Sequence, residues 1–479
     1  MSAAQKMQQV VEDDDQGSLL GTRHADGRWI FDPKRTWATA RAFCDEFHHH
    51  PDGSTLVAHH GTFLTWVQNH YQPVSDATIR HRAHPWLDRA YRLKVDEKNG
   101  RASLHDFEAN PRTVNEAVES IRTRVHLADS INAPCWLDGR TDPAPRELVA
   151  CRSLNLHVPS GRILPPTPAL FTTTALDYDY DPHAAEPVQW IARLREYWPD
   201  DDASIETLQE FFGYLIGGGT SLQKMLLLVG PRRAGKGTIG RVLTATVGAG
   251  NVVNPTTGSL AGTFGLQPLI GKSVAIVSDA RFSGEGIATV TERLLNISGE
   301  DAITVDRKFQ PSVTTRLPTR FVFLTNELPR IADSANALAG RFIVLRLTRS
   351  FYGQEDTGLT DTLLAERPSI LLWAIAGLRR LLARGHFVQP QSAEDAIRDL
   401  EDLASPVGAF VRECCVVGAG RRTAVESVFN AWKRWCEAEG RSTPGTRQRF
   451  GRDLTAAVPG VKRKRGTGDV PFYEGIDLR

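Results

Sequence analysis

One segment of the 479-residue chain constrains its fold more than any other, KMLLLVGPRRAGKGTIGRVL at residues 224–243. It begins as an apolar run of buried-strand type, passes through a glycine-rich turn and continues with helical spacing. Three further compact apolar runs follow downstream, SVAIVSD, RFVFLTN and RFIVLRL, and helical or loop segments separate them. Buried strands that alternate with helices form parallel sheets covered on both faces. The pattern therefore predicts an α/β fold with a mostly parallel sheet.

The glycine-rich turn has the spacing G-x-x-x-x-G-K, from Gly230 through Gly235 to Lys236. Between a strand and a helix, such a turn curls its backbone N–H groups around phosphate, and the helix N-terminus adds a favourable dipole. Lys236 would then reach the β- and γ-phosphates as a positive charge. A chance glycine-rich turn is the alternative, but strand, loop and helix all agree. We therefore predict that ATP binds to the whole stretch, Gly230, Pro231, Arg232, Arg233, Ala234, Gly235, Lys236, Gly237 and Thr238.

One position departs from this P-loop pattern. The usual Ser or Thr directly after the lysine is replaced by Gly237, and the hydroxyl comes one place later, at Thr238. We expect Mg²⁺ as a second cofactor, with Thr238 and Asp279 as its candidate ligands. Because of the shift, Thr238 would either hold the metal, act through water or contact phosphate instead.

Polar residues next to the other apolar runs complete a predicted catalytic set with Lys236. Asp279 ends SVAIVSD, where it would hold magnesium or orient the attacking water. Asn326 ends RFVFLTN, where its amide would hold that water against the γ-phosphate. Arg341 begins RFIVLRL, just before the expected buried strand, from where it would reach the nucleotide of an adjacent subunit. The plainer alternatives are a capping Asp, a turn-forming Asn and a surface Arg.

Charge is unevenly distributed along the chain. The totals nearly cancel, at 57 basic and 56 acidic side chains, but residues 441–479 carry nine Lys or Arg against four Asp or Glu. The run Lys462-Arg463-Lys464-Arg465 is typical of a nuclear localisation signal or of a strand-turn-strand wing whose cations contact DNA phosphate, and we prefer the second interpretation. No apolar run reaches the roughly eighteen residues of a membrane span, and neither a secretory signal nor a CxxC pair is found. We expect a cytoplasmic protein without a membrane partner.

The order of these features resembles that of superfamily 3 helicases, specifically the phage and plasmid primase–helicase family. The order is GPRRAGKGT, Asp279, a middle stretch ERLLNISGEDAITVDRKF, Asn326 and Arg341. LDYDYDPHAAEPVQWIARLREYWPDDDASIETLQEFFGYLIGG resembles the domain that precedes the ATPase in that family. SPVGAFVRECC, VESVFNAWKRWCEAEG and VKRKRGTGDVPFYEGIDL resemble the winged-helix domain that closes poxvirus-type and phage NTPases. The longer members also carry a primase catalytic domain before the helicase, and we expect no primase activity in these 479 residues.

The resemblance implies a fold class and a domain order. The class is α/β, with a P-loop ATPase core of AAA+-like, superfamily 3 helicase type, a mixed, mainly helical N-terminal domain and a C-terminal winged-helix domain. The implied segments are a disordered or extended tail at 1–35, an N-terminal helicase-associated domain at 36–200, the ATPase core at 201–356, a helical connection and linker at 357–404, and the winged helix at 405–479.

The resemblance also implies an activity and partners. Members act as ATP-dependent replicative DNA helicases of phages, plasmids or integrated mobile elements. They form rings, usually homo-hexamers, which translocate on single-stranded or forked DNA, and a separate primase or initiator is a further candidate partner. The implied DNA-binding residues are Arg307 and Lys308, where the family carries a hairpin facing the pore, and Arg447, Arg449, Lys462, Arg463, Lys464 and Arg465.

Two other functions stay open. A DNA-binding replication regulator would use the ATP site as a switch, without unwinding. A nucleoside monophosphate kinase-like phosphotransferase also carries GKGT after a P-loop, but it would leave the basic C-terminal segment unexplained. DNA-stimulated ATP hydrolysis with strand separation favours the helicase, whereas stimulation by a nucleoside monophosphate favours the kinase.

Overall fold

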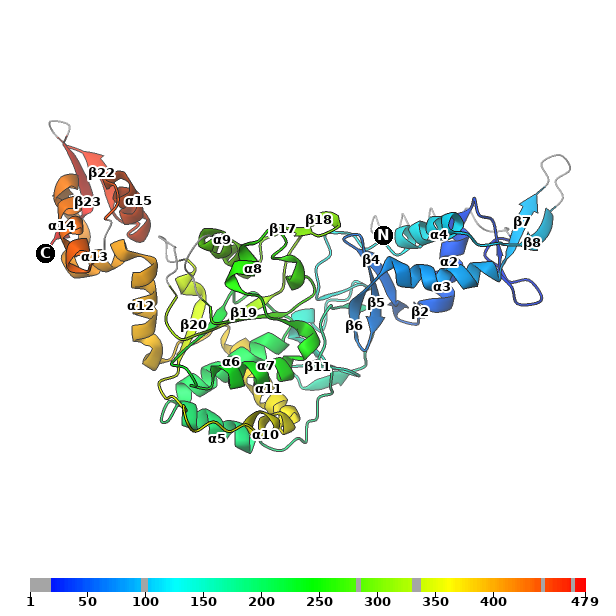
Figure 1. Cartoon of the computed structure of the whole chain (residues 1–479), viewed down its shortest axis with the longest axis horizontal. Coiled ribbons are helices and arrows are strands. Elements are labelled where there is room, and N and C mark those ends of the chain that lie inside the picture. The colour runs from blue at the N-terminus through cyan, green and yellow to red at the C-terminus, as the bar shows by residue number, and fades with distance from the viewer. Residues whose placement is uncertain (1–18, 96–101, 281–285, 330–336, 441–443, 467–469) are drawn as a thin grey trace. The chain divides into compact units, whose positions relative to one another are not determined.

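The computed structural model contains two compact units, and Figure 1 shows the chain coloured along its sequence. Unit 1 comprises residues 1–145 and 165–175, and unit 2 comprises residues 146–164 and 176–479. The residues that the structure describes are 19–95, 102–280, 286–329, 337–440, 444–466 and 470–479. The five segments expected from the sequence divide the chain more finely and stay a prediction.

The described part of unit 1 combines three helices with small sheets. The helices are α2 (Thr36–Phe47), α3 (Asp76–Asp88) and α4 (Pro111–Arg124). The sheets are β1–β7–β8 (Ile30–Phe31, Tyr91–Val95, Ala102–Asp106), β4–β5–β6 (Leu56–His59, Thr62–Val67, His70–Val74), β2–β3 (His49–His50, Gly53–Ser54) and β9–β13 (Cys135–Trp136, Leu170–Phe171). The expected domain is mixed and mainly helical, and the described residues of unit 1 show helices and short strands in similar amounts. Alternating apolar and polar runs, such as residues 56–74, pair as antiparallel strands.

Unit 2 is built on a five-stranded sheet in which every pairing is parallel. Its order is β15 (Val252–Val253), β16 (Val274–Ser278), β19 (Arg320–Thr325), β14 (Met225–Val229) and β20 (Phe342–Arg346). The side chains of β14 alternate between two cores, because Leu226 and Leu228 enter one and Leu227 enters the other. Both faces are buried, as strands this apolar require. The predicted α/β fold with a mostly parallel sheet is confirmed.

Helices of unit 2 contribute to both of these cores. The core that contains Leu226 also takes side chains from α5 (Val188–Tyr197), α6 (Asp202–Ile216), α7 (Lys236–Val247), α10 (Leu359–Ala365) and α11 (Arg367–Arg384). The core that contains Leu227 takes side chains from α8 (Thr257–Ala261), α9 (Ile287–Ser298) and α12 (Glu394–Ala404). A small antiparallel sheet β10–β11–β12 (Leu148–Ala150, Asn155–His157, Arg162–Leu164) and a hairpin β17–β18 (Ile303–Arg307, Gln310–Thr315) complete this part.

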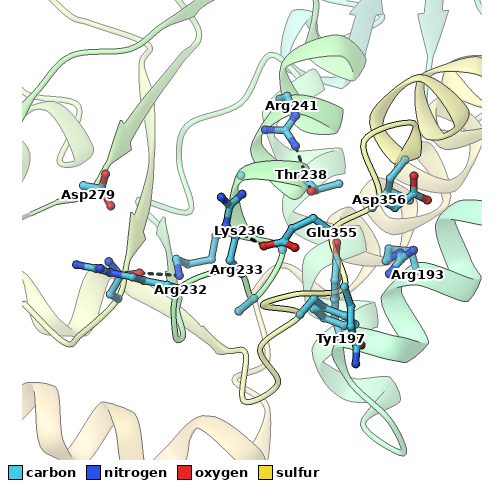
Figure 2. A pocket seen from close by; sticks show the side chains of 17 residues that line it. Arg193, Tyr197, Arg232, Arg233, Lys236, Thr238, Arg241, Asp279, Glu355 and Asp356 are labelled. Carbon is cyan, nitrogen blue, oxygen red and sulfur yellow. Dashed lines mark hydrogen bonds and ion pairs between the residues drawn. The ribbon is translucent and has the colours of Figure 1, made fainter.

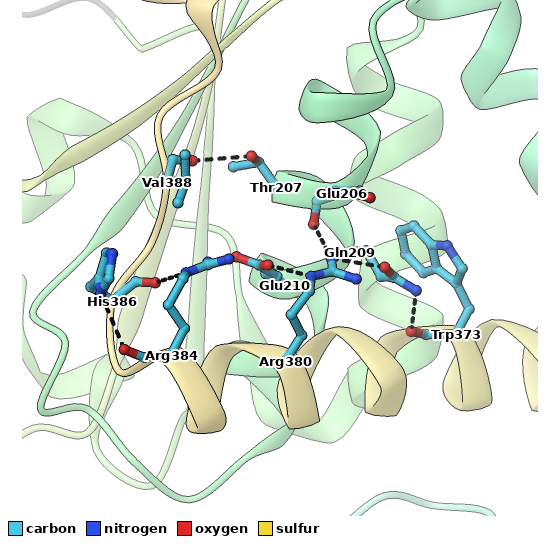
Figure 3. Close-up of polar contacts among 9 residues, drawn as sticks. All are labelled: Glu206, Thr207, Gln209, Glu210, Trp373, Arg380, Arg384, His386 and Val388. Carbon is cyan, nitrogen blue, oxygen red and sulfur yellow. Dashed lines mark hydrogen bonds and ion pairs between the residues drawn. The ribbon is translucent and has the colours of Figure 1, made fainter.

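Helices α6 and α11 pack at short range because glycines face the contact. A Cβ on Gly213 or on Gly377 would stand 2.5 Å from a backbone carbonyl oxygen of the opposite helix. Polar groups along the same contact are paired, as Figure 3 shows. The buried carboxylate of Glu210 accepts from Arg380 Nε at 2.6 Å and also from Arg384. This contact ties the helix that precedes β14 to the helix that follows β20.

The C-terminal segment of unit 2 has a core of its own, built around Phe410, Trp432, Trp435 and Phe450. Its elements are α13 (Pro406–Cys414), β21 (Cys415–Ala424), α14 (Val425–Ala438), α15 (Arg447–Ala457), β22 (Lys462–Arg465) and β23 (Pro471–Leu478). The three strands form an antiparallel sheet in the order β21–β23–β22. The assignment of this segment as a winged helix stays a prediction. Among the described residues of the chain, no helix is long and apolar enough to cross a membrane.

Candidate functional site

The carboxyl ends of the parallel strands meet at one edge of the sheet in unit 2. The loop after β14 begins at Gly230, Asp279 follows β16, and Asn326 follows β19. A cavity of about 690 Å³ opens at this edge, and Figure 2 shows its lining. It brings together most of the predicted nucleotide-binding stretch, residues 232–238, with Asp279 and Asn326. Gly230 and Pro231 support the loop without lining the cavity.

The loop between β14 and α7 keeps its shape through two glycines. Gly235, directly before α7, has a φ of +96°, a conformation that a side chain would strain. A Cβ there would also stand 2.3 Å from Cζ of Tyr197, whose ring rests on the loop. At the other end, a Cβ on Gly230 would stand 2.6 Å from the carbonyl oxygen of Leu347. Because α7 starts directly after Gly235, its first backbone N–H groups and its dipole favour an anion here.

Lys236 lies folded against this loop. Its ammonium donates to the carbonyl oxygens of Gly230 at 2.7 Å and Pro231 at 2.8 Å, and to Oδ1 of Asn326 at 3.0 Å. The pKa of this ammonium is lowered, because burial lowers it more than the nearby carboxylate of Asp279 raises it. Lys236 is only 9% exposed. Two predicted motifs separated by 90 positions thus meet at one ammonium group.

Asp279 and Asn326 follow adjacent strands of the sheet. Strand β19 lies between β16 and β14, so the end that carries Asn326 lies between those that carry Asp279 and the glycine-rich loop. Both residues are exposed and line the cavity. Asp279 has a φ of +50°, a left-handed conformation that few residues other than glycine adopt. Residues held in this way cluster at functional sites, where the surrounding structure enforces the strain.

Thr238 faces a different part of the cavity. Its hydroxyl accepts from Arg241 Nη2 at 3.3 Å and shares a hydrogen bond with the phenol of Tyr197. Burial raises the pKa of Tyr197, so the phenol stays protonated at neutral pH. In the view of Figure 2, Asp279 and Thr238 lie on opposite sides of Lys236. The role of Thr238 among the three expected ones stays a prediction.

Several lining residues carry no sequence motif, and the sequence analysis missed them. Tyr197 comes from the end of α5, and Phe351, Glu355 and Asp356 come from segment 347–358 after β20. The rings of Tyr197 and Phe351 meet edge to face, with centroids 5.7 Å apart. No local spacing signals these residues, because their common location depends on how α5 and the segment after β20 fold onto the sheet.

Arg341 lies outside the cavity of its own chain. It directly precedes β20, whereas the cavity opens where that strand ends, about five residues or roughly 16 Å further along. Its Nη1 donates to the carbonyl oxygen of Leu295 at 3.0 Å and to Oγ of Ser298 at 2.8 Å, at the end of α9. Of the four predicted catalytic residues, three therefore line one cavity, and Arg341 lies away from it.

The hairpin β17–β18 presents a cationic and aromatic tip. Arg307 ends β17 and donates from Nε to the carbonyl oxygen of Pro311 at 2.8 Å. Lys308 follows, with its ammonium 5.1 Å from the ring centre of Phe309. Phe309 is 93% exposed, and the sequence analysis did not single it out. An exposed aromatic flanked by cations is suited to nucleic acid, because bases stack on rings and phosphates attract cations.

The predicted basic residues of the C-terminal segment lie on two of its elements. Strand β22 carries the four exposed cations Lys462 to Arg465, and Arg447 and Arg449 begin α15. In the register of the same sheet, Arg422 of β21 and Lys462 of β22 both lie directly opposite Glu474 of the central strand β23. Arg422 therefore extends this cationic surface, although the sequence analysis did not include it.

Comparison with known proteins gives two family matches. Residues 228–341 match the sequence family described as "Family of unknown function (DUF5906)". Residues 404–470 match the family described as "Poxvirus D5 protein-like". The first match spans Lys236, Asp279, Asn326 and Arg341, the four predicted catalytic residues. The second agrees with the poxvirus-type resemblance expected for the C-terminal segment.

Among solved structures, the chain is similar to that entitled "The A form apo structure of NrS-1 C terminal region-CTR". That similarity has 13% sequence identity and a TM-score of 0.49, and covers 93% of this chain and 100% of that chain. A second structure, of residues 305–718 of the same region, gives 13% identity and a TM-score of 0.47, with 90% of this chain and 88% of that chain covered.

Proposed function

We propose that this chain is an ATP-dependent replicative DNA helicase of superfamily 3 type, from a phage, plasmid or integrated mobile element. The observation that carries the proposal is the meeting of Lys236, Asn326 and Asp279 in one cavity at the N-terminus of α7. These residues follow the ends of three separate strands, β14, β16 and β19, and a helix N-terminus with a lysine is suited to phosphate. The match to poxvirus D5-like proteins at 404–470 supports a replicative role.

In this proposal each cavity residue has a distinct task. Backbone N–H groups of residues 232–238 bind the phosphates, and Lys236 exchanges its loop carbonyls for β- and γ-phosphate oxygens. The amide of Asn326 keeps Lys236 in register and orients the attacking water. The exposed carboxylate of Asp279 is a hard oxygen ligand of the kind that Mg²⁺ prefers, so it fits the metal. Bound Mg²⁺ would neutralise charge that develops on the phosphates.

The proposal assigns the DNA contacts to the cationic surfaces. The hairpin tip with Arg307 and Lys308 would face single-stranded DNA in the pore of a homo-hexameric ring, where repeated cations track the backbone. The C-terminal segment would act as a winged helix, with Arg447 and Arg449 on its helix and Lys462 to Arg465 on its wing. A separate primase or initiator is the partner proposed for starting synthesis.

ATP hydrolysis with and without single-stranded DNA tests the proposal. The full chain, Lys236→Ala and the control Lys272→Ala would be assayed in parallel, followed by unwinding of a forked duplex. Lys272 is a suitable control because its ammonium contacts the Gly250 carbonyl oxygen outside the cavity. We expect DNA-stimulated hydrolysis and strand separation that only Lys236→Ala abolishes. Full hydrolysis by Lys236→Ala would refute the site, hydrolysis without unwinding would favour the switch, and stimulation by a nucleoside monophosphate alone would favour the kinase.

A further inference from the structure

The cavity extends well beyond the residues that the proposed function uses. Its volume of about 690 Å³ falls in the range that encloses a whole cofactor-sized ligand. Lys236, Asp279 and Asn326 account for one end, where charge and amide groups dominate. The other end is lined by Arg193, Tyr197, Phe351, Gln354 and Asp356. In Figure 2, Arg193, Tyr197 and Asp356 lie to the right of Lys236.

An aromatic wall bounds this second end. Phe351 is half-buried, meets the buried ring of Tyr197 edge to face, and has the guanidinium of Arg193 5.7 Å from its ring centre. Rings and guanidinium planes of this kind stack on flat heteroaromatic groups. The polar side chain of Gln354 stands near this wall and offers both a donor and an acceptor for the edge of such a group.

The aromatic wall is fastened directly to the phosphate end. Phe351 donates its backbone N–H to the carbonyl oxygen of Arg233 at 3.0 Å, and Ser350 Oγ donates to that of Arg232 at 2.8 Å. The carboxylate of Glu355 lies 3.6 Å from the guanidinium of Arg233. Segment 350–356 is therefore held at a fixed distance from the loop. A site that binds one ligand with an aromatic end and a phosphate end requires such a fixed distance.

Asp356 supplies an acceptor next to the wall. Its Oδ1 accepts from the backbone N–H of Gly358 at 2.9 Å, which orients the carboxylate. A carboxylate that is held in one orientation can accept hydrogen bonds from the hydroxyl groups of a ligand, as an acidic residue does for ribose in dinucleotide sites. Segment 350–356 and Tyr197 lie outside both family matches, so the assignment of this end rests on the contacts of these residues and not on a family pattern.

We propose that Phe351 and Tyr197 form the nucleobase wall of a nucleoside subsite and that Asp356 binds a ribose hydroxyl. The inference rests on the proposed function, because it takes the triphosphate to occupy the loop end. It adds specificity to that function, since the chain would prefer a ribonucleoside triphosphate to its deoxy analogue and to a bare polyphosphate.

Calorimetric titration of the full chain with ATP, dATP and inorganic tripolyphosphate, each with Mg²⁺, tests the inference. We expect Phe351→Ala to weaken ATP binding about 5- to 100-fold, as loss of a stacking ring does, and to leave tripolyphosphate binding within about twofold. Tyr352→Ala is the matched control, because Tyr352 is the adjacent aromatic residue, 81% exposed and outside the cavity lining. Ala at position 351 keeps the backbone N–H that holds the loop, so the change removes only the ring.

A comparison of ATP with dATP tests the ribose contact separately. We expect wild type to bind ATP about tenfold more tightly than dATP, and Asp356→Asn to remove most of that preference. Asp361→Asn, an exposed acid on α10 outside the cavity lining, is the control. Retention of the full ATP-over-dATP preference by Asp356→Asn would overturn the ribose assignment.

The outcomes separate this inference from the proposed function. An equal loss of ATP and tripolyphosphate binding in Phe351→Ala would make the ring a brace for the loop and overturn the nucleoside subsite. Unchanged ATP binding in that variant would overturn it as well. If Lys236→Ala bound both ligands as wild type does, the phosphate site itself would fail, whatever Phe351→Ala does. Loss of both ligands in Lys236→Ala together with loss of ATP alone in Phe351→Ala supports both proposals.

Discussion

Lys236 donates a hydrogen bond to Oδ1 of Asn326 at 3.0 Å, across the edge between two adjacent parallel strands. The two residues belong to motifs 90 positions apart, and the contact joins the lysine proposed to bind phosphate to the residue proposed to orient water. Under the proposed function, nucleotide binding and hydrolysis would therefore be coupled at one ammonium group. A change at Asn326 acts on Lys236 as well, in a direction that depends on the charge introduced.

Asn326→Ala and Asn326→Asp should have different consequences. Loss of the amide in Asn326→Ala leaves Lys236 free to meet phosphate, so we expect ATP affinity within a few-fold of wild type and kcat about 10²- to 10³-fold lower. Asn326→Asp places a carboxylate against Lys236 and beside the triphosphate, so we expect weaker ATP binding as well. Titration of ATP and measurement of kcat on both variants check this. Equal ATP affinity in the two variants would contradict the contact.

Gly235→Ala should disrupt the loop. A φ of +96° costs a residue with a Cβ about 1–3 kcal/mol of backbone strain. The new Cβ would also stand 2.3 Å from Cζ of Tyr197. We expect loss of ATP binding and a lower melting temperature. Gly250→Ala is the control, because Gly250 lies outside the cavity lining and its added Cβ would meet nothing within 4 Å. Thermal unfolding and ATP titration of both variants decide, and equal effects would exclude the conformational explanation.

The phosphate end of the cavity follows from the sequence because its chemistry is carried by consecutive residues and by strand ends. A glycine-rich turn between a strand and a helix defines Lys236, and parallel strands bring Asp279 and Asn326 to the same edge. The nucleoside end has no such rule. Tyr197 and Phe351 meet only because α5 and the segment after β20 converge, and no spacing along the chain encodes that approach.

The N-terminal unit shows a second limit of prediction from sequence. Its strands run for only two to six residues, and outside residues 56–74 most are too short to show an alternation of apolar and polar side chains that distinguishes them from helical turns or loops. Between residues 76 and 95, for example, the helix α3 ends at Asp88 and residues from Tyr91 pair with β1 and β8. Burial against neighbouring elements, and not local spacing, decides the structure there.

The stability of unit 1 should depend on a buried histidine. His48 is 5% exposed, and burial, aided by the charge of Arg82, lowers its pKa to about 4. Its unfolded pKa is about 6.5, so the unfolded chain binds the proton more readily between these values. The contribution of neutral His48 to stability is therefore complete above pH 6.5. It is lost as pH falls from 6.5 toward 4, by up to about 1.4 kcal/mol per pH unit.

Hydrogen exchange of the α2 amides between pH 7 and pH 4.5, corrected for the intrinsic exchange rate, measures this dependence. We expect protection in wild type to fall with pH more steeply than in His48→Asn, whose amide can keep the contact to Thr55 but cannot take up a proton. His59, whose pKa burial also lowers to about 4, leaves a residual slope in both proteins. Identical slopes in the two proteins would show that His48 is protonated without cost in the folded state.

Arg341 should act on a neighbouring subunit. It lies at the amino end of β20, away from its own cavity, so within one chain it cannot reach the phosphates. We expect Arg341→Ala to bind ATP normally and to lose hydrolysis by about 10³-fold or more, as loss of an arginine finger does. Lys236→Ala should be inactive for the opposite reason, because it fails at binding. Neither variant alone contains a complete site.

Mixing the two inactive variants then distinguishes action on a neighbouring subunit from a local structural role. In an equimolar mixed ring, about a quarter of the interfaces pair an intact Lys236 with an intact Arg341, so we expect hydrolysis to return to roughly that fraction of wild type. The control is each variant mixed with itself at the same total concentration. If the mixed rings assemble, as sedimentation would establish, and yet hydrolyse no ATP, Arg341 acts only through its contacts to the end of α9.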